Sequence, residues 1–220
     1  MKKYEFTGET KNHFGVTLHQ IRALVTITGV VSSSDVGGWV AAKKCLSHNG
    51  NAWVYGDAQV YDNARVSGNA QVSGNARVYS NAQVYGNAWV YGDAQVSGYA
   101  LVYDNALVSG NAQVYGNARV SGNARVSGNA QVYSNAQVYG NAQVESIEAI
   151  CAFSGFGAEF RTTTAFIDKE LGIRIVCGCF TGTLYQFREK VIETHGEDSK
   201  NGKLYLGMAN MIELRLEATK

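Results

Sequence analysis

Small apolar residues recur at a fixed interval through the middle of the chain. Valine occupies every sixth position from Val54 to Val144, and alanine stands two residues before each of these valines, from Ala52 to Ala142. Between one valine and the next alanine stand Tyr or Ser, then Gly, Asp or Ser, then usually Asn. The unit is therefore A-x-V-(Y/S)-(G/D/S)-N, and such an unbroken period is the signature of a repeat architecture.

Each six-residue unit, or hexad, predicts a short extended side followed by a corner. Ala and Val are two residues apart and point to one side of the chain, whereas x and Tyr/Ser point to the other. The Gly-Asn pair suits a sharp corner because both residues tolerate positive φ. Three such sides close into a coil whose turns stack through backbone hydrogen bonds, with Ala and Val inside and asparagines stacked at the corners. We expect most hexad residues to be scaffold, with specificity on the outward positions.

The repeat resembles the hexapeptide repeats of left-handed parallel β-helices, whose coil is a triangular prism. This resemblance implies the handedness, which the periodicity alone does not. We expect a mainly β chain in three parts: an N-terminal β cap over 1–50, a hexapeptide-repeat β-helix over 51–145, and a C-terminal ββαα module over 146–220.

The segment before the repeats is expected to cap the open end of the coil, because solenoid ends expose apolar residues and unpaired backbone. Tyr4 to Thr10 and Val16 to Val31 have the β-branched character of strands, with Gly15 near a turn. Trp39 and Leu46 are candidates to plug the N-terminal end.

The segment after the repeats predicts two strands and two helices: Phe160 to Asp168, Ile173 to Phe180, Leu184 to His195 and Lys203 to Glu217. Thr183 and Gly196 bound the first helix as start and stop. Cys177 and Cys179 are expected on one strand face, which is not the C-x-x-C spacing of a metal knuckle. We favour buried small side chains there over a metal site shared with Cys151 or His195.

Residues eighteen apart should lie above one another on three outward faces. One face carries an aromatic and apolar strip that we expect to be exposed and to form an oligomer interface, with a homotrimer favoured: Trp53, Tyr55, Trp89, Tyr91 and Leu107. The other two faces supply candidate ligand-binding residues: Tyr61, Tyr79, Tyr115 and Tyr133 on one, Arg65 and Arg119 on the next. Tyr and Arg suit a nucleotide-type ligand through base stacking and bidentate phosphate contacts.

The repeats give little support for catalysis. Hexapeptide folds include acyltransferases, which usually interrupt the coil with a loop and use a histidine as general base. Here the frame is unbroken from Val54 to Val144, and that stretch contains no His, Cys, Lys or Glu. His48, just before the repeats, is a candidate base, although a lone histidine at a cap is more often structural. We therefore expect no enzyme activity and no cofactor.

Charge and composition exclude some partners. The 220-residue chain has a formal net charge of +1, which gives no reason to expect duplex nucleic acid or an anionic membrane as partner. No apolar run approaches the roughly 18 residues of a membrane span. The N-terminus MKKYEFTGET has no apolar segment behind its lysines, so we expect a cytoplasmic protein with mostly reduced cysteines.

The opening MKKYEFTGET…VTLHQIRALV, the DVGGWV step, the GNAxV array and the tail CGCFTGTLYQF…THG together resemble uncharacterised hexapeptide-repeat proteins of bacteriophages and prophages. The resemblance covers nearly the whole chain and implies a viral origin, but no chemistry. It motivates the leading hypothesis of a non-enzymatic antagonist of host defence that sequesters a small nucleotide signal. The alternatives are a protein-binding scaffold that blocks a host protein and an acyltransferase.

Overall fold

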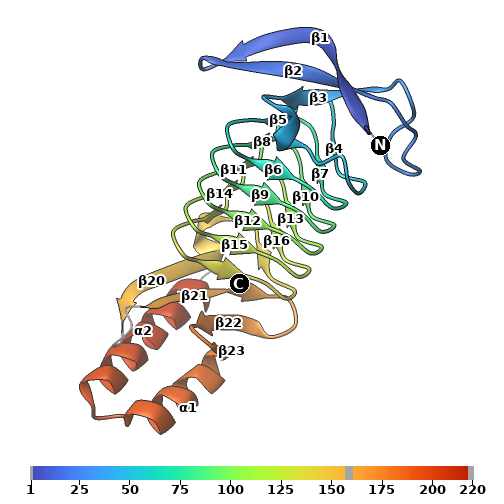
Figure 1. Ribbon diagram of the computed structural model, residues 1–220. Helices are drawn as coiled ribbons and strands as arrows, with labels where there is room; N and C mark the ends of the chain where they lie inside the picture. Colours follow the sequence, from blue (N-terminus) through green and yellow to red (C-terminus); the bar gives the residue numbers. More distant parts are fainter. Residues whose placement is uncertain (1, 157–160, 218–220) are drawn as a thin grey trace.

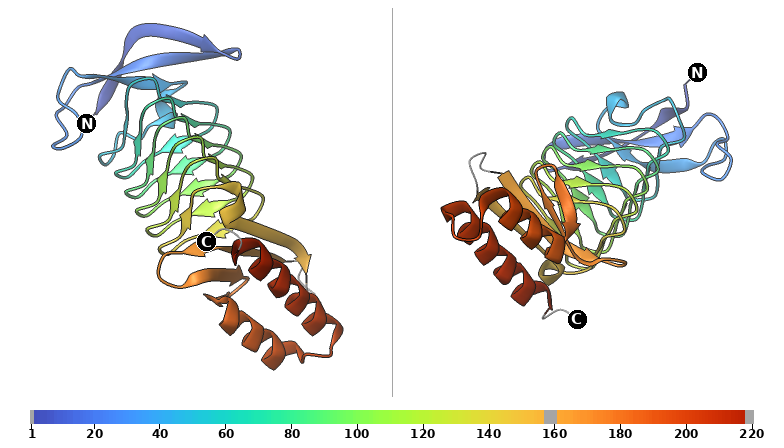
Figure 2. Two further views of the ribbon diagram at one scale, coloured as in Figure 1. Left: turned by 180° about the vertical axis from the view of Figure 1, so that it is seen from behind. Right: turned by 90° about the horizontal axis from the view of Figure 1, so that it is seen from below.

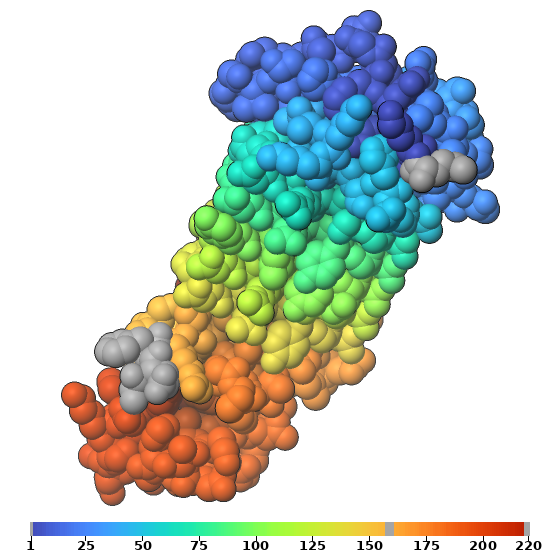
Figure 3. All heavy atoms as spheres, in the orientation of Figure 1, coloured from blue at the N-terminus to red at the C-terminus, as the bar shows by residue number. Residues whose placement is uncertain are grey.

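The chain forms a parallel β-solenoid of about six turns between two unlike caps (Figures 1 and 2). The computed structural model describes residues 2–156 and 161–217. The solenoid is a column with the N-terminal strands across one end and the C-terminal strands and helices at the other (Figure 3). This arrangement confirms the predicted fold class.

Each hexad forms one two-residue strand, and strands eighteen residues apart pair in parallel. The tryptophan face is formed by β4 (Trp53–Val54), β7 (Gln71–Val72), β10 (Trp89–Val90), β13 (Leu107–Val108), β16 (Arg125–Val126) and β19 (Gln143–Val144). The tyrosine face is formed by β5 (Gln59–Val60), β8 (Arg77–Val78), β11 (Gln95–Val96), β14 (Gln113–Val114) and β17 (Gln131–Val132). The arginine face is formed by β6 (Arg65–Val66), β9 (Gln83–Val84), β12 (Leu101–Val102), β15 (Arg119–Val120) and β18 (Gln137–Val138).

The interior of the solenoid is the Ala and Val lattice that the repeat predicts. Every alanine from Ala52 to Ala142 and every valine from Val54 to Val144 is at most 1% exposed. Backbone hydrogen bonds join successive turns, and the corner asparagines form side-chain amide ladders, such as Asn69 to Asn87 (3.0 Å). In the hexads it is the Gly, Asp or Ser that takes the positive φ, and no hexad Asn does so.

The N-terminal cap is a β-hairpin that continues into the solenoid. β1 (Tyr4–His13) pairs antiparallel with β2 (Val16–Ala23), which ends earlier than the strand predicted to reach Val31. β3 (Val36–Val40) pairs antiparallel with β2 and parallel with β5, so the stack begins ahead of the hexads. A short 3-10 helix, η1 (Lys43–Cys45), follows.

The residues that close the N-terminal end differ in part from the prediction. Leu46 is fully buried and bridges to Val66, as expected of a plug. Trp39 is not a plug, because it is in register with Gln59 and therefore points outward, under the ammonium of Lys11 at 4.2 Å from the ring centroid. Trp53 is the large side chain buried at this end.

The C-terminal module is a four-stranded antiparallel sheet with two helices. After η2 (Ile147–Ala149) come β20 (Ile150–Phe156), β21 (Arg161–Asp168), β22 (Gly172–Cys177), β23 (Phe180–Thr183), α1 (Leu184–His195) and α2 (Lys200–Glu217). The module thus has two strands more than predicted, because β20 was missed and the strand expected over 173–180 is a hairpin. Phe160, the predicted start of β21, lies outside the described residues.

The turn of that hairpin separates the two cysteines. Cys177 pairs with Phe180 across the turn formed by Gly178 and Cys179. The prediction that Cys177 and Cys179 share one strand face is therefore wrong.

The four-stranded sheet lies between the solenoid and the helices. Phe166 and Val176 on one face join the solenoid core, whereas Ala165 and Ile175 on the other pack under α1 and α2. The sheet also satisfies part of the backbone of the last turn, because the backbone N–H of Gln137 donates to the Thr164 hydroxyl (3.1 Å). In the described part of the chain, neither helix is long and apolar enough to cross a bilayer.

Candidate binding pocket between the solenoid and the C-terminal module

The predicted ligand-binding residues lie on two separate faces. The four tyrosines share the tyrosine face as two stacked pairs, Tyr61 on Tyr79 (5.1 Å between ring centroids) and Tyr115 on Tyr133 (5.6 Å). Arg65 and Arg119 are exposed on the neighbouring arginine face, so the structure does not gather the six residues into one site.

The two ends of the tyrosine face differ in exposure. Tyr61 is 8% exposed because the hairpin residue His13 packs edge-on against it, with ring centroids 5.4 Å apart. Tyr133, next to the C-terminal module, is 44% exposed. Only the second end therefore presents a tyrosine ring that a ligand can reach.

The predicted exposed strip on the tryptophan face is shorter than expected. Trp53 is fully buried, and the Tyr55 hydroxyl donates to the Val30 carbonyl (3.0 Å), so the N-terminal cap covers both residues. The assignment of Trp53 to an exposed interface is wrong, because the hexad pattern gives the direction of a side chain and not what folds over it. Tyr55 is half-buried. Trp89 remains exposed, 5.0 Å from the ring of Tyr91, and Leu107 is half-buried beside it in register.

His48 is held by the cap in a way that favours a structural role. Its Nδ1 accepts a hydrogen bond from the Lys3 backbone N–H (3.1 Å), and its ring stacks on Tyr4 with 4.4 Å between centroids. Burial, helped by the nearby lysines, lowers the pKa of the imidazole. A neutral ring with one nitrogen already engaged fits the packing of this cap.

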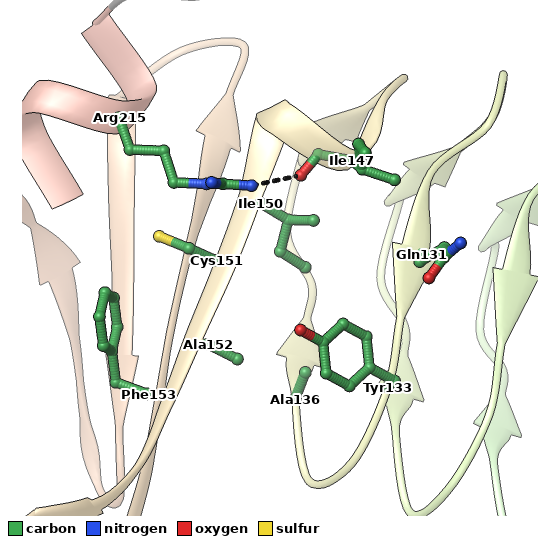
Figure 4. Close-up of a pocket in the computed structure, with 9 residues that line it drawn as sticks. All are labelled: Gln131, Tyr133, Ala136, Ile147, Ile150, Cys151, Ala152, Phe153 and Arg215. Atoms are coloured by element: carbon green, nitrogen blue, oxygen red, sulfur yellow. Dashed lines mark hydrogen bonds between the residues drawn. The ribbon is translucent and has the colours of Figure 1, made fainter.

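A cavity of about 410 Å³ opens where the last turns of the solenoid meet the C-terminal module (Figure 4). We call it the junction pocket, and its lining residues are Gln131, Tyr133, Ala136, Ile147, Ile150, Cys151, Ala152, Phe153 and Arg215. Its volume lies within the roughly 300–1,000 Å³ range of small-molecule sites.

Three separate elements position these side chains. Gln131 and Tyr133 flank Val132 in β17, and the inward packing of that valine turns both outward. Phe153 comes from β20 on the opposite wall. Arg215 extends from the last turn of α2 and donates to the Ile147 carbonyl (3.1 Å), so it crosses above the pocket from one wall toward the other (Figure 4).

Among the residues that the structure describes, the lining of the pocket is mostly apolar and carries a single charged group. Arg215 donates one hydrogen bond, to the Ile147 carbonyl, through one of its nitrogens. A guanidinium has five N–H donors. Burial raises the pKa of the Cys151 thiol to about 11, against the opposing effect of Arg215. No His, Asp, Glu or Lys is among the described residues that line it. An exposed ring, apolar walls and one cation suit a small anion with a flat apolar part.

The other cysteines give no support for a metal centre. Cys177 accepts from the Thr163 hydroxyl (3.1 Å), and His195 stacks on Tyr205 with 5.4 Å between centroids. Cys177, Cys179 and His195 line a smaller cavity of about 220 Å³. Within residues 2–156 and 161–217, no three His, Cys, Asp or Glu residues are grouped to hold a metal ion.

Sequence reasoning found Tyr133 and missed the rest of the junction pocket. Arg215 and Ile147 are 68 residues apart in the chain, and each belongs to a segment without repeat character. Their meeting depends on how the module packs on the solenoid. The one local signal was the arginine in the last turn of α2.

Comparison with known proteins identifies the repeats and leaves the caps unassigned. No curated protein matches the chain. The family model described as the YdcK beta solenoid repeat matches residues 58–72, 70–81, 82–98, 100–116, 112–123 and 118–134, all within the solenoid. The hexads are thus similar to YdcK β-solenoid repeats. The junction pocket lies between the last of the matched repeats, which contains Gln131 and Tyr133, and the C-terminal module.

Proposed function

We propose that the protein is a non-enzymatic binding protein that captures a small planar anion of nucleotide type in the junction pocket. The observation that carries the proposal is the presence, in one open cavity, of an exposed tyrosine ring and a guanidinium on opposite walls (Figure 4). Base stacking and bidentate phosphate contact are the two interactions that such groups provide.

Each group is held in place before a ligand arrives. The Tyr133 ring is backed by Tyr115, whose own hydroxyl reaches Gln131 Oε1 (3.5 Å), so the outer ring face stays free for stacking. Arg215 is anchored at the Ile147 carbonyl, which leaves other N–H groups for an anion. Fixed groups lose little conformational entropy on binding, which favours affinity.

The lining favours binding over turnover. Chemistry at neutral pH needs a general base or an activated nucleophile, and neither type of side chain, in the required form, is among the described residues that line the junction pocket. The one nucleophilic side chain, Cys151, stays protonated at neutral pH because its pKa is about 11. A ligand held here would leave unchanged.

The biological role that we propose is antagonism of host defence by a phage-encoded protein in the bacterial cytoplasm. It rests on the resemblance of the terminal segments to phage hexapeptide-repeat proteins together with the junction pocket. Sequestration suits a protein without turnover, because a binder removes a signal by mass action alone.

The test is native mass spectrometry of the full chain with cyclic nucleotides and ADP-ribose-type nucleotides. We expect one nucleotide per chain, and loss of binding by Arg215→Gln and Tyr133→Ser. Serine occupies the post-valine position in other hexads, such as Ser97 and Ser109, so Tyr133→Ser suits the fold. Tyr79→Ser is the matched control on the same face and should bind normally.

Two outcomes would overturn the proposal. One is no uptake of any nucleotide in the panel. The other is uptake that Arg215→Gln leaves unchanged, which would move the ligand to another site. If no nucleotide binds, recovery of a stoichiometric host protein on the immobilised chain would favour the scaffold alternative, for which the exposed Trp89 is the available aromatic anchor.

A further inference from the structure

Helix α2 has a second apolar stripe that nothing in the described chain covers. Its buried face packs into the module through residues such as Tyr205, Met208 and Ile212. The second stripe, which we call the α2 seam, consists of Leu204, Gly207, Met211 and Leu214. The three large side chains are 43%, 49% and 75% exposed, and a Cβ added at Gly207 would meet open space.

The spacing of the α2 seam is that of a coiled-coil interface. Its residues are three, four and three positions apart, which places them at successive a and d positions of a heptad. A strict a/d stripe is narrower than the face that a helix uses to pack on a globular core, and is typical of a seam with one other helix. The occupant expected on this face is therefore a helix.

The α2 seam is complementary to itself in one orientation. When two copies of α2 run antiparallel, a residues face d residues of the other helix. Leu204 then faces Leu214 of the second copy, and Gly207 faces Met211, so the gap at glycine receives a long flexible side chain. A two-fold axis repeats both layers. In a parallel pair, Gly207 would face Gly207 and leave a void in the seam.

The flanking charges favour the same orientation. Lys203 and Glu217 both occupy g positions, and antiparallel pairing brings g positions of the two helices together, so each lysine meets the glutamate of the other copy. Both residues are exposed. The present partner of Lys203 is Asp198 (3.5 Å), and because both side chains are largely solvated this pair contributes little and can exchange.

We propose that the protein forms a two-fold symmetric dimer in which the α2 seams of two copies pack antiparallel. The contact is isologous, so it closes after two subunits. Helix α2 lies at the far end of the molecule from the N-terminal hairpin (Figure 1). In the proposed dimer the two solenoids therefore extend away from the contact. The α2 seam and the junction pocket share helix α2 but no residue. Dimerisation and nucleotide binding can therefore be lost independently.

The test is sedimentation velocity of the full chain over a concentration series. We expect a dimer, and monomers for Leu214→Asp and for Gly207→Leu. Gly207→Leu is informative because the added side chain meets open space in the monomer but meets Met211 of the second copy in the dimer. Its circular dichroism spectrum should match that of the parent protein. Phe14→Ser removes an apolar side chain that is 88% exposed at the other end and should leave the dimer intact.

A charge exchange tests the orientation. Lys203→Glu and Glu217→Lys should each weaken dimerisation, by about tenfold in Kd for a loss near 1.4 kcal/mol, and the double variant should regain most of the affinity. A monomer at all concentrations, a trimer, a dimer that survives Leu214→Asp, or single exchanges that the double variant does not rescue would overturn the proposal.

Discussion

Most corners of the solenoid have one residue with positive φ that lies against its equivalent in the next turn. Gly110 has φ +62°, and a Cβ there would lie 3.0 Å from the Gly128 nitrogen. Asp104 takes the same backbone conformation (φ +58°), and its carboxylate accepts a hydrogen bond from the Gly122 N–H (3.2 Å). The Asp104 side chain thus bonds from its corner to the next turn.

This contrast predicts two different costs at one position. Gly110→Ala should lower the free energy of unfolding by about 1–2 kcal/mol, because alanine disfavours positive φ and its Cβ crowds the next turn. Gly110→Asp should cost less than about 1 kcal/mol, because its carboxylate can accept the Gly128 N–H. Urea unfolding measures both. If Gly110→Asp were less stable than Gly110→Ala, steric crowding, and not the missing hydrogen bond, would determine which residues the corner accepts.

Lys3 gives the N-terminal cap a pH dependence. The side chain is 3% exposed, and its Nζ donates to the Ala52 carbonyl (2.7 Å), while burial lowers its pKa from 10.5 to about 8. Between these two values the unfolded chain binds more protons than the folded one, so the contribution of Lys3 to the unfolding free energy rises with pH.

We therefore expect the stability of the parent protein to rise, relative to that of Lys3→Met, from about pH 7 to about pH 10. Urea unfolding of both proteins across this range measures the difference. Cys45 and Tyr4, whose pKa values are raised mainly by burial, change stability in the opposite direction but are common to both proteins. A difference that stays constant with pH would show that Lys3 keeps an ordinary pKa.

At the scale of elements, the sequence predicts the bounds of a helix or strand where residues close in sequence determine them. Thr183 and Gln186 make the capping box that begins α1, and Gly196 ends it at φ +75°, so the bounds of this helix could be predicted from the sequence. β20 could not, because its strand state comes from pairing with β21. The burial of Trp53 was missed for the same reason: the cap residue Gly37 closes over its ring.

The element that closes the C-terminal end should stabilise mainly the turns next to it. Phe166→Ala removes a fully buried ring from the joint of sheet and solenoid, at a cost of about 3–5 kcal/mol. Because repeats contact only their neighbours, we expect hydrogen exchange to accelerate in β16 to β19 and in the sheet, but little in β4 to β7. Leu171→Ala, at a half-exposed turn, is the control. Uniform acceleration along the solenoid would contradict this view.

At the scale of the whole molecule, the hexads predict a column but not where a site lies on it. Gln131 and Tyr133 occupy positions equivalent to those of Gln113 and Tyr115 one turn earlier. They differ only because β20 and α2 pack beside them and supply the opposite wall. A regular array thus offers many equivalent surfaces, and the non-repetitive ends select the one that becomes a pocket.

If the column is a one-dimensional stack, its length should be adjustable in whole hexads and in nothing smaller. Deletion of residues 89–94 joins Ala88 to Gln95 and keeps the Ala/Val frame. We expect this variant to unfold cooperatively, with a loss of about 0.3–0.9 kcal/mol for six residues, and to keep the junction pocket. Its C-terminal module should be rotated by one side of the prism relative to the N-terminal hairpin.

Deletion of residues 89–93 is the matched variant, because it joins Ala88 to Ala94 and shifts the frame by one residue. Side chains of a strand alternate in direction, so one junction turn must then direct polar residues inward or leave backbone groups unpaired. Such a defect should cost several times more than the loss of a whole hexad, and thermal unfolding followed by circular dichroism compares the two. Equal stability of the two deletion variants would mean that the corners, and not the Ala/Val lattice, set the register of the stack.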